Sequence, residues 1–454
     1  MSKDINTLLS QAAKWIINAE SGARFRVVSH YDADGITAAA IICKTLMRLG
    51  FDFHVSLMRN PFTKGIERIK EEKNTHIIFT DMGSGQLPML EELDANILIL
   101  DHHQLKTETT KDHIFQVNVN SCGINGNYDA CGSTLSYSVS KKVDANNIDL
   151  SGLAIAGATG DKQYIGGFKG FNKTLIEDAV NNHAVKEHTG LKLSEPTISE
   201  SLYYSVEPYY MNLSGDYDQI NHFLTKLQID KEQPYMELSN QKREDLHSAL
   251  MLHLMKQGCE TTILETVIRT RYTSDMTYGE MEQFADLLDS CGKGGYRDLG
   301  LALSLGDEKN YKKAKTHERT FKQDLLDELH RLESEGVNET SSYRYFFTDQ
   351  TSLGGVIGGI ATNFILDTKK PLLSIARKKD EIHISCRGNQ NLVKNGLDLG
   401  GAMSSIAKKL NGHGGGHKIA AGATLPIDAE ETFIKETEKL IHEQLKSQKN
   451  EERI

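Results

Sequence analysis

The sequence lacks the features that mark secreted, zinc-ribbon and membrane proteins. Its 454 residues include only six cysteines, and none has Cys-x-x-Cys spacing, which argues against a disulfide framework and a zinc knuckle. No apolar stretch at the N-terminus suits a signal peptide, and no long span is free of charge. We therefore expect a cytoplasmic protein in a reducing compartment, with no membrane partner.

The chain also lacks an excess of positive charge. Its 52 Lys and Arg against 62 Asp and Glu give a net charge of −10. This balance argues against a protein that coats nucleic acid with its whole surface, but it leaves room for a local basic groove. Carboxylates gathered around metal ions would account for part of the acidic excess. The length and the 39% hydrophobic content predict a globular protein of two or three domains.

Short apolar runs alternate with helical stretches in the first third of the chain. The stretch Ile36–Leu49 is a predicted helix, and similar helical pieces separate several of the apolar runs. This alternation is typical of a parallel α/β sheet. The predicted strands are 24–29, 53–57, 76–80, 96–100 and 114–119.

The later parts of the chain change character. Residues 194–338 are rich in charge and in helix formers, and we expect a mostly helical insert there. Its cation-rich stretch Lys309–Lys322 is typical of a solvated helix face, with contact to a nucleic-acid backbone as the alternative. Residues 339–430 return to β-type runs, and 431–454 predict a charged helix. The predicted fold is an α/β protein with a parallel-sheet domain over 1–193, the helical insert, and a smaller C-terminal α/β domain.

The stretch VSHYDADGITAAA, residues 28–40, ends an apolar run with three polar groups at alternate positions. If the chain stays extended here, His30, Asp32 and Asp34 face a common point, and Gly35 then permits a tight turn. A mixed His and Asp set suits Mn²⁺, or a site that accepts both Mn²⁺ and Mg²⁺. One aspartate alone would more simply cap the following helix. The three together favour metal ligation.

Three further polar clusters follow predicted elements. Asp81 follows the strand 76–80, Asp101-His102-His103 follows the strand 96–100, and Asp161 follows a run of small residues. Each has a plainer interpretation, as a turn residue or as surface histidines. Ligands bind at the carboxyl ends of parallel strands, so we expect these groups to converge there with the first cluster. Asp101 could orient one of the imidazoles.

These clusters supply six candidate metal ligands. Six are too many for one catalytic ion that keeps open positions, and they suit two ions that share a bridging carboxylate. Two metal ions about 4 Å apart activate a water and stabilise the attacking and leaving oxygens of phosphoryl transfer. The sequence therefore predicts phosphoester hydrolysis. The candidate ligands are His30, Asp32, Asp34, Asp81, His102 and Asp161.

A glycine-rich run near the C-terminus offers a candidate phosphate site. Gly412–His417 (GHGGGH) predicts a loop whose successive backbone N–H groups bind an anion. Arg387 follows a predicted strand and is a candidate for bidentate binding of a phosphate through its guanidinium. The plainer interpretations are a flexible glycine turn and a surface arginine.

Taken in order, these motifs resemble those of the DHH phosphoesterase superfamily. DADG, the strand-ending Asp81, DHH at 101–103 and Asp161 occur in the order of its four motifs. SCRG at 385–388 and GGGH at 414–417, followed by Ala-Ala-Gly at 420–422, resemble the associated C-terminal DHHA1 domain. The form HxDADG resembles RecJ-type nucleases in particular.

The resemblance implies roles for individual residues. One Mn²⁺ or Mg²⁺ ion would be held by His30, Asp32 and Asp81. The other would be held by Asp34, Asp81, His102 and Asp161, with Asp81 as the bridge. His103, beside Asp101, would contact the scissile phosphate. The substrate-binding residues of the C-terminal domain would be Arg387, Gly414, Gly415, Gly416 and His417.

The layout resembles archaeal RecJ-like proteins, which associate with the GINS replication complex and resemble an inactive eukaryotic helicase partner. The residues after the glycine-rich run lead us to expect no counterpart of the additional β-barrel of bacterial RecJ. The resemblance implies an exonuclease on single-stranded DNA in replication or repair, with RNA as an open second substrate. It would release mononucleotides, with 5′→3′ polarity favoured.

Two alternatives remain: a phosphodiesterase for short oligonucleotides or cyclic dinucleotides, and a replisome scaffold bound to GINS. The complete ligand set disfavours a scaffold without activity.

Overall fold

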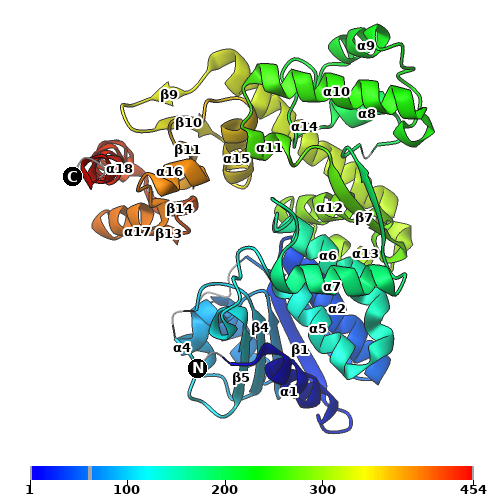
Figure 1. The fold of residues 1–454 in the computed structure, drawn as a ribbon. Helices are drawn as coiled ribbons and strands as arrows, with labels where there is room; N and C mark the ends of the chain where they lie inside the picture. Colours follow the sequence, from blue (N-terminus) through cyan, green and yellow to red (C-terminus); the bar gives the residue numbers. More distant parts are fainter. Residues whose placement is uncertain (1–2, 60–63, 106, 194, 452–454) are drawn as a thin grey trace. The chain divides into compact units, whose positions relative to one another are not determined.

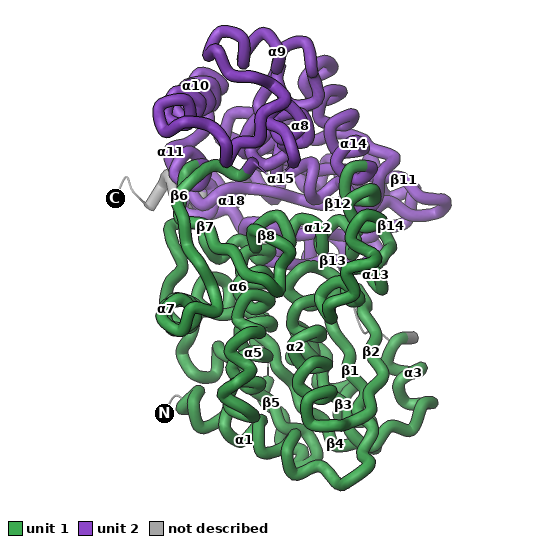
Figure 2. The backbone as a smooth tube through the Cα atoms, turned by 90° about the vertical axis from the view of Figure 1, so that its right-hand side faces the viewer, with its two compact units in different colours: residues 1–192, 268–319 green, residues 193–267, 320–454 purple. Residues whose placement is uncertain are grey.

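The computed structural model describes residues 3–59, 64–105, 107–193 and 195–451, which divide into two compact units. Unit 1 comprises residues 1–192 and 268–319, and unit 2 comprises residues 193–267 and 320–454 (Figure 2). The residues of the expected helical insert, 194–338, are shared between the two units. Ser194, at its first position, and residues 452–454 of the expected terminal helix lie outside the described residues.

Unit 1 is built on a five-stranded parallel sheet, which confirms the predicted α/β class (Figure 1). Every predicted strand is present to within one residue at either end. The strand order changes direction between β1 and β3, and ligands bind at such a switch point in open α/β sheets. In sheet order the strands are β2 (Asp52–Met58), β1 (Arg24–His30), β3 (His76–Thr80), β4 (Asn96–Asp101) and β5 (Ile114–Asn118).

Alternate side chains of these strands enter cores on opposite faces of the sheet. Val27 and Ile78 join the larger core, whereas Val28 and Phe79 join the smaller one. Burial on both faces explains why the strands are nearly continuous apolar runs. The larger core includes α1 (Ile5–Ile17), α2 (Ala33–Leu49) and α5 (Gly132–Val143), and the smaller includes α3 (Lys64–Glu71) and α4 (Leu87–Leu90).

Further helices and a small antiparallel sheet complete unit 1. Helix α2 packs against α5, α6, α12 and α13, so residues from 281 onward lie beside the helix that follows β1. The helices are α6 (Ser151–Gly160), α7 (Gly170–Asn181), α12 (Met281–Lys293) and α13 (Arg297–Leu305). The strands are β6 (Lys186–Gly190), β7 (Arg269–Ser274) and β8 (Gly279–Glu280). Helix α14 (Tyr311–Glu335) begins in unit 1 and ends in unit 2.

Unit 2 joins a helical part to a six-stranded mixed sheet. The helical part holds α8 (Ile198–Tyr203), α9 (Tyr217–Lys226), α10 (Asn240–Gln257) and α11 (Thr261–Leu264). In sheet order the strands are β13 (His413–Gly416), β14 (Ala420–Pro426), β12 (Glu381–Arg387), β11 (Leu372–Lys378), β10 (Arg344–Thr348) and β9 (Asn338–Glu339). The sheet is accompanied by α15 (Gly354–Phe364), α16 (Gln390–Lys394), α17 (Leu399–Lys409) and α18 (Glu430–Glu451). No helix within these described ranges has the length and hydropathy needed to cross a membrane.

The glycine-rich run differs from its prediction as a loop. His413–Gly416 forms the edge strand β13, paired antiparallel with β14. A Cβ on Gly414 would lie 2.5 Å from the carbonyl oxygen of Met403 in α17. Glycine here allows a strand to lie close to a helix. A run of glycines in a sequence fits this packing and a turn equally well, so the pattern alone does not distinguish them.

Candidate metal centre

The alternate polar groups of the HxDxD motif gather where β1 ends and α2 begins. Asp32 is both a helix cap and a member of the cluster: its Oδ1 accepts the N–H of Gly35 at 3.1 Å, while its Oδ2 lies 2.8 Å from His30 Nδ1. The capping and ligand interpretations are therefore compatible. Among the described residues, the buried His30 Nδ1 has no partner with hydrogen-bond geometry. A buried imidazole nitrogen that lies close to carboxylates but forms no well-aligned hydrogen bond with them fits a metal ligand.

Asp34 is fixed by a second helix. Its carboxylate accepts the N–H groups of Gly132 at 2.7 Å and Ser133 at 2.9 Å, at the N-terminus of α5. A helix N-terminus stabilises a carboxylate through its free N–H groups and its dipole. A Cβ on Gly132 would lie 2.6 Å from Asp81 Cβ, so this position requires glycine if both aspartates are to approach α5.

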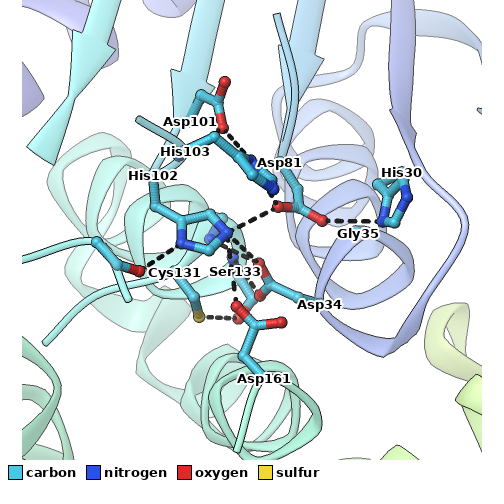
Figure 3. A network of polar contacts seen from close by, with 12 residues as sticks. His30, Asp34, Gly35, Asp81, Asp101, His102, His103, Cys131, Ser133 and Asp161 are labelled. Carbon is cyan, nitrogen blue, oxygen red and sulfur yellow. Dashed lines mark hydrogen bonds and ion pairs between the residues drawn. The ribbon is translucent and has the colours of Figure 1, made fainter. Parts of the chain in front are cut away.

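Asp81 lies between two imidazoles. Its Oδ2 is 3.6 Å from His30 Nδ1 and its Oδ1 is 3.1 Å from His102 Nε2 (Figure 3). The side chain is only 2% exposed, and the backbone has a φ of +55°, a region that non-glycine residues seldom adopt. Such backbone strain persists where the surroundings determine the position tightly. Each oxygen of one carboxylate thus faces a different histidine, which is the arrangement that a bridging ligand needs.

The tautomer of His102 follows from its surroundings. Its Nδ1 lies 2.6 Å from the carbonyl oxygen of Gly126, and since a carbonyl can only accept, Nδ1 carries the proton. The other nitrogen, Nε2, faces Asp161 Oδ2 at 3.5 Å and Asp34 Oδ2 at 3.9 Å. Gln163 donates to the same Gly126 carbonyl at 3.1 Å and so helps to hold it. A carbonyl that fixes one imidazole nitrogen and frees the other is typical of metal-ligating histidines.

The six predicted ligands are therefore brought together. Their donor atoms form two groups, within each of which the atoms lie within 4.8 Å of one another, and His103 joins a third group with Asp81 and His102. Burial and the Asp81 carboxylate raise the pKa of Asp34 to about 6. Burial and the Asp34 carboxylate raise the pKa of Asp161 well above its ordinary range. Divalent cations would relieve this repulsion, so the donor set fits metal ions. The two groups are His30, Asp32 and Asp81, and Asp34, His102 and Asp161.

Asp101 orients His103. Its Oδ1 accepts from His103 Nδ1 at 2.8 Å and from the His103 N–H at 3.1 Å, and its Oδ2 accepts the N–H of Ser84 at 2.9 Å. Burial alone would lower the pKa of His103, but the Asp101 carboxylate outweighs it and raises that pKa to about 9. The imidazole is therefore a cation at neutral pH, and 46% of its side chain is exposed.

Two asparagines that the sequence did not single out fix the backbone of the DHH segment. Asn118 Nδ2 donates to the carbonyl of His103 at 3.0 Å, and Asn120 Nδ2 donates to the carbonyl of His102 at 2.9 Å. Asn118 ends β5, the neighbour of β4 in the sheet. The position of Asn118 at a strand end is a signal that the sequence offers, whereas Asn120 lies in the short 3-10 helix that follows, Val119–Cys122.

A contact from far along the chain supports the segment between His30 and Asp34. Asp289 Oδ1, in α12, accepts the N–H of Ala33 at 2.9 Å, and Asp289 also pairs with Lys293. A Cβ on Gly292 would lie 1.9 Å from the carbonyl oxygen of Tyr31, so α12 touches this segment directly. No local pattern predicts Asp289, since 256 residues separate it from Ala33.

The predicted substrate-binding residues form a separate group, in unit 2. Arg387 ends β12 and lies against the start of α15, where a Cβ on Gly355 would be 2.6 Å from its Nη2. Its Nη1 donates to the carbonyl of Cys386 at 2.9 Å, and no carboxylate among the described residues pairs with it. Burial lowers its pKa. Gly414, Gly415 and Gly416 lie in the edge strand, and the N–H of His417 donates to the carbonyl of Ala420 at 2.8 Å in the turn to β14.

Comparison with known proteins agrees with this architecture. The model of the DHH family N-terminal domain matches residues 24–158, and that of the DHHA1 domain matches residues 343–443. An uncharacterized protein of Methanocaldococcus jannaschii is 28% identical over 428 residues, covering 93% of this chain and 94% of that protein.

Two solved structures share the fold. CDC45 from Entamoeba histolytica has a TM-score of 0.68 at 11% identity, with 96% of this chain and 99% of that chain covered. RecJ from Thermus thermophilus in complex with Mn²⁺ has a TM-score of 0.60 at 16% identity. That alignment covers 96% of this chain and 55% of the RecJ chain, so this chain spans about half the length of that relative.

Proposed function

Since the chain belongs to the DHH/DHHA1 superfamily, we propose that it is a two-metal phosphodiesterase that acts as a single-strand-specific exonuclease on DNA. The observation that carries this proposal is the position of Asp81, whose two oxygens face His30 and His102 in two different donor groups. A carboxylate shared between two cation sites can hold two ions about 4 Å apart, which is the separation used in two-metal phosphoryl chemistry.

Each donor group would hold one divalent cation, Mn²⁺ or Mg²⁺. His30 and Asp32 would complete one site, and Asp34, His102 and Asp161 the other, with Asp81 in both. When bound, two such cations supply an acidified water and stabilise charge on the phosphate. The chain itself fixes the ligands, through the α5 N–H groups on Asp34 and the Gly126 carbonyl on His102.

His103 would act on the phosphate directly. Because its Nδ1 is engaged by Asp101, its Nε2–H is the available donor. A cationic imidazole that donates to a phosphoryl oxygen stabilises the charge that develops there, and the Asp101 contact orients it beforehand. Asp101 is thus a positioning residue and His103 a catalytic one.

Arg387, Gly414, Gly415, Gly416 and His417 would bind the substrate strand through its phosphates. The guanidinium has no carboxylate partner among the described residues, and the glycines present backbone without side chains at a sheet edge. Both features suit close approach of an anionic backbone. Release of mononucleotides from one end, with 5′→3′ polarity, is the expected outcome.

The test is a product time course with Mn²⁺. The substrates are single-stranded DNA and RNA of about ten and thirty nucleotides, labelled at either end. Early release of mononucleotides from one end of the long DNA supports the proposal and gives the polarity. Hydrolysis confined to the shortest substrates would instead identify a phosphodiesterase of short oligonucleotides. No hydrolysis, with Mn²⁺ bound, would favour a scaffold.

Association with the GINS complex stays a prediction, to be tested by co-purification.

A further inference from the structure

A row of aromatic and cationic side chains leads away from His30 within unit 1. Tyr31 lies edge-on to the His30 ring, with centroids 4.7 Å apart. The guanidinium carbon of Arg297 lies 5.0 Å from the centroid of the Tyr31 ring. The preceding residue along the chain, Tyr296, stacks on His317 with centroids 3.5 Å apart and an interplanar angle of 20°. We call Tyr31, Arg297, Tyr296 and His317 the aromatic row.

The aromatic row does not have the properties of a structural core. Tyr296 is 40% exposed, although it is a large ring already stacked on one side. No carboxylate within the described ranges pairs with Arg297, whose Nη1 lies 3.4 Å from the carbonyl of Leu57. In the same ranges His317 Nε2 has no hydrogen-bond partner. A purely structural arginine in a chain of net charge −10 would more simply be ion-paired.

The row starts at the candidate metal centre and stays close to it. Its first member, Tyr31, lies between the ligands His30 and Asp32 in the chain. Tyr296 is three residues beyond Lys293, the partner of Asp289, which in turn binds the N–H of Ala33. Arg297, the next residue after Tyr296, contacts the ring of Tyr31, so the exposed Tyr296 ring lies one residue away from a side chain that touches the ligand-bearing segment.

We propose that the aromatic row binds single-stranded nucleic acid, with Tyr296 stacking on a base beyond the cleaved nucleotide and Arg297 contacting the backbone. This inference rests on the proposed function and names the substrate contact of the same site. Non-specific single-strand binding combines cations that follow the backbone with aromatic rings on which bases stack. Tyr296, which is 40% exposed, offers such a ring, and His317 stacks on it.

The test compares variants of Tyr296 with a matched control. Tyr217 in unit 2 is 49% exposed and also stacks face to face on a second ring, Tyr203, at 4.2 Å. Binding of a fluorescent ten-nucleotide oligothymidylate is measured without divalent cations, and hydrolysis is measured on the same oligonucleotide and on a dinucleotide. Tyr296→Leu should weaken binding and raise KM on the ten-mer by about tenfold, within the range of one stacking contact. Tyr296→Phe should stay near wild type, as should Tyr217→Leu.

Two results would overturn the inference. One is binding by Tyr296→Leu that equals wild type. The other is an equal loss on the dinucleotide and the ten-mer, which would mean that the ring supports the metal centre and does not bind a base. If Tyr296→Leu fails to fold, photocrosslinking of an iodouracil-containing oligonucleotide to the wild-type protein decides, because a base on the row must crosslink at Tyr296. If the wild type binds the ten-mer through Tyr296 but hydrolyses none of the substrates, the proposed exonuclease activity is contradicted. The binding of single-stranded nucleic acid by the aromatic row is then still supported.

Discussion

The candidate metal centre in unit 1 and the Arg387 and glycine group in unit 2 are built in opposite ways. In the metal centre Asp34 and Asp81 are 1% and 2% exposed, and neighbouring elements fix individual ligands through backbone groups. In unit 2 the guanidinium of Arg387 lies over glycines of α15, and the glycine strand lies at a sheet edge. The proposed function thus assigns the reaction geometry to buried contacts and the binding of the strand to a region poor in side chains.

The two regions also differ in the charge that they offer a ligand. Buried carboxylates with raised pKa values have a strong preference for a cation. The guanidinium of Arg387, which has no carboxylate partner among the described residues, has a strong preference for an anion. We therefore expect changes in the metal centre to alter kcat, and changes in the unit 2 group to alter mainly KM.

Loss of the shared carboxylate should have the largest effect. Asp81→Asn keeps the size of the side chain but removes a negative charge from both proposed metal sites. We expect kcat/KM to fall by more than about 10³-fold, the upper scale for losing a preorganised electrostatic stabiliser. Circular dichroism and thermal unfolding should remain close to wild type, and Asp112→Asn at an exposed position is the control. Retained turnover would contradict the bridging role.

Asp101→Asn should be next in size and should change the pH profile. In the wild type we expect kcat to fall as the pH rises through about 9. The reason is that His103 must be protonated to act, and the pKa of His103 is raised to about 9. Without the carboxylate, burial pulls the pKa of His103 down, so the basic limb should move to lower pH. The loss of kcat should reach about 10²-fold at pH 8 and be smaller at pH 6. An unshifted limb would show that His103 is not the titrating group.

Asp289→Ala should weaken Mn²⁺ binding while leaving all six ligands in place. Partners that position metal ligands from outside typically contribute about 10–100-fold to affinity, and we expect a loss of that size by calorimetry. Asp289→Asn retains an acceptor for the Ala33 N–H and should therefore keep most of the wild-type affinity for Mn²⁺. Equal losses in both variants would assign the effect to the Lys293 ion pair instead.

The affinity for Mn²⁺ should also depend on pH. The folded, metal-free protein binds a proton at Asp34 below about pH 6, whereas the ordinary carboxyl pKa is 3.8. A cation must displace that proton, so affinity should fall about tenfold per pH unit below 6. The metal-free protein should, in the opposite sense, lose stability as the pH rises from about 4 to 6, because the folded state binds more protons there. Titrations at pH 5 and pH 7, with proton release measured, test both statements.

Gly355→Ala, beside Arg387 in unit 2, should have the smallest effect on catalytic efficiency. A Cβ there would displace the Arg387 guanidinium, whose Nη2 lies 2.6 Å from its position. We expect KM to rise about tenfold, roughly 1.4 kcal/mol of binding, with kcat nearly unchanged. Gly359→Ala is the matched control, since its Cβ would have 4.0 Å to the nearest atom of Arg387. A fall in kcat without a rise in KM would contradict a binding role.

The convergence of the candidate metal ligands could be predicted from short sequence patterns. Polar residues after buried strands must meet at one sheet edge, so His30, Asp81 and His102 could be placed together without coordinates. The supporting contacts could not be predicted, since Gly132 meets Asp34 across 98 residues and Asp289 meets Ala33 across 256. The sequence predicts a loop at His413–Gly416, where the structure has a strand, because glycine suits both a turn and close packing on a helix.

The decisive measurement for the shared carboxylate is a Mn²⁺ titration of the whole chain, followed by electron paramagnetic resonance. We expect two ions per chain whose spectrum shows magnetic coupling, because one carboxylate, Asp81, joins the two sites. Asp81→Asn should abolish the coupling. A single bound ion, or two ions with independent spectra, would contradict the shared-carboxylate centre on which the proposed reaction depends.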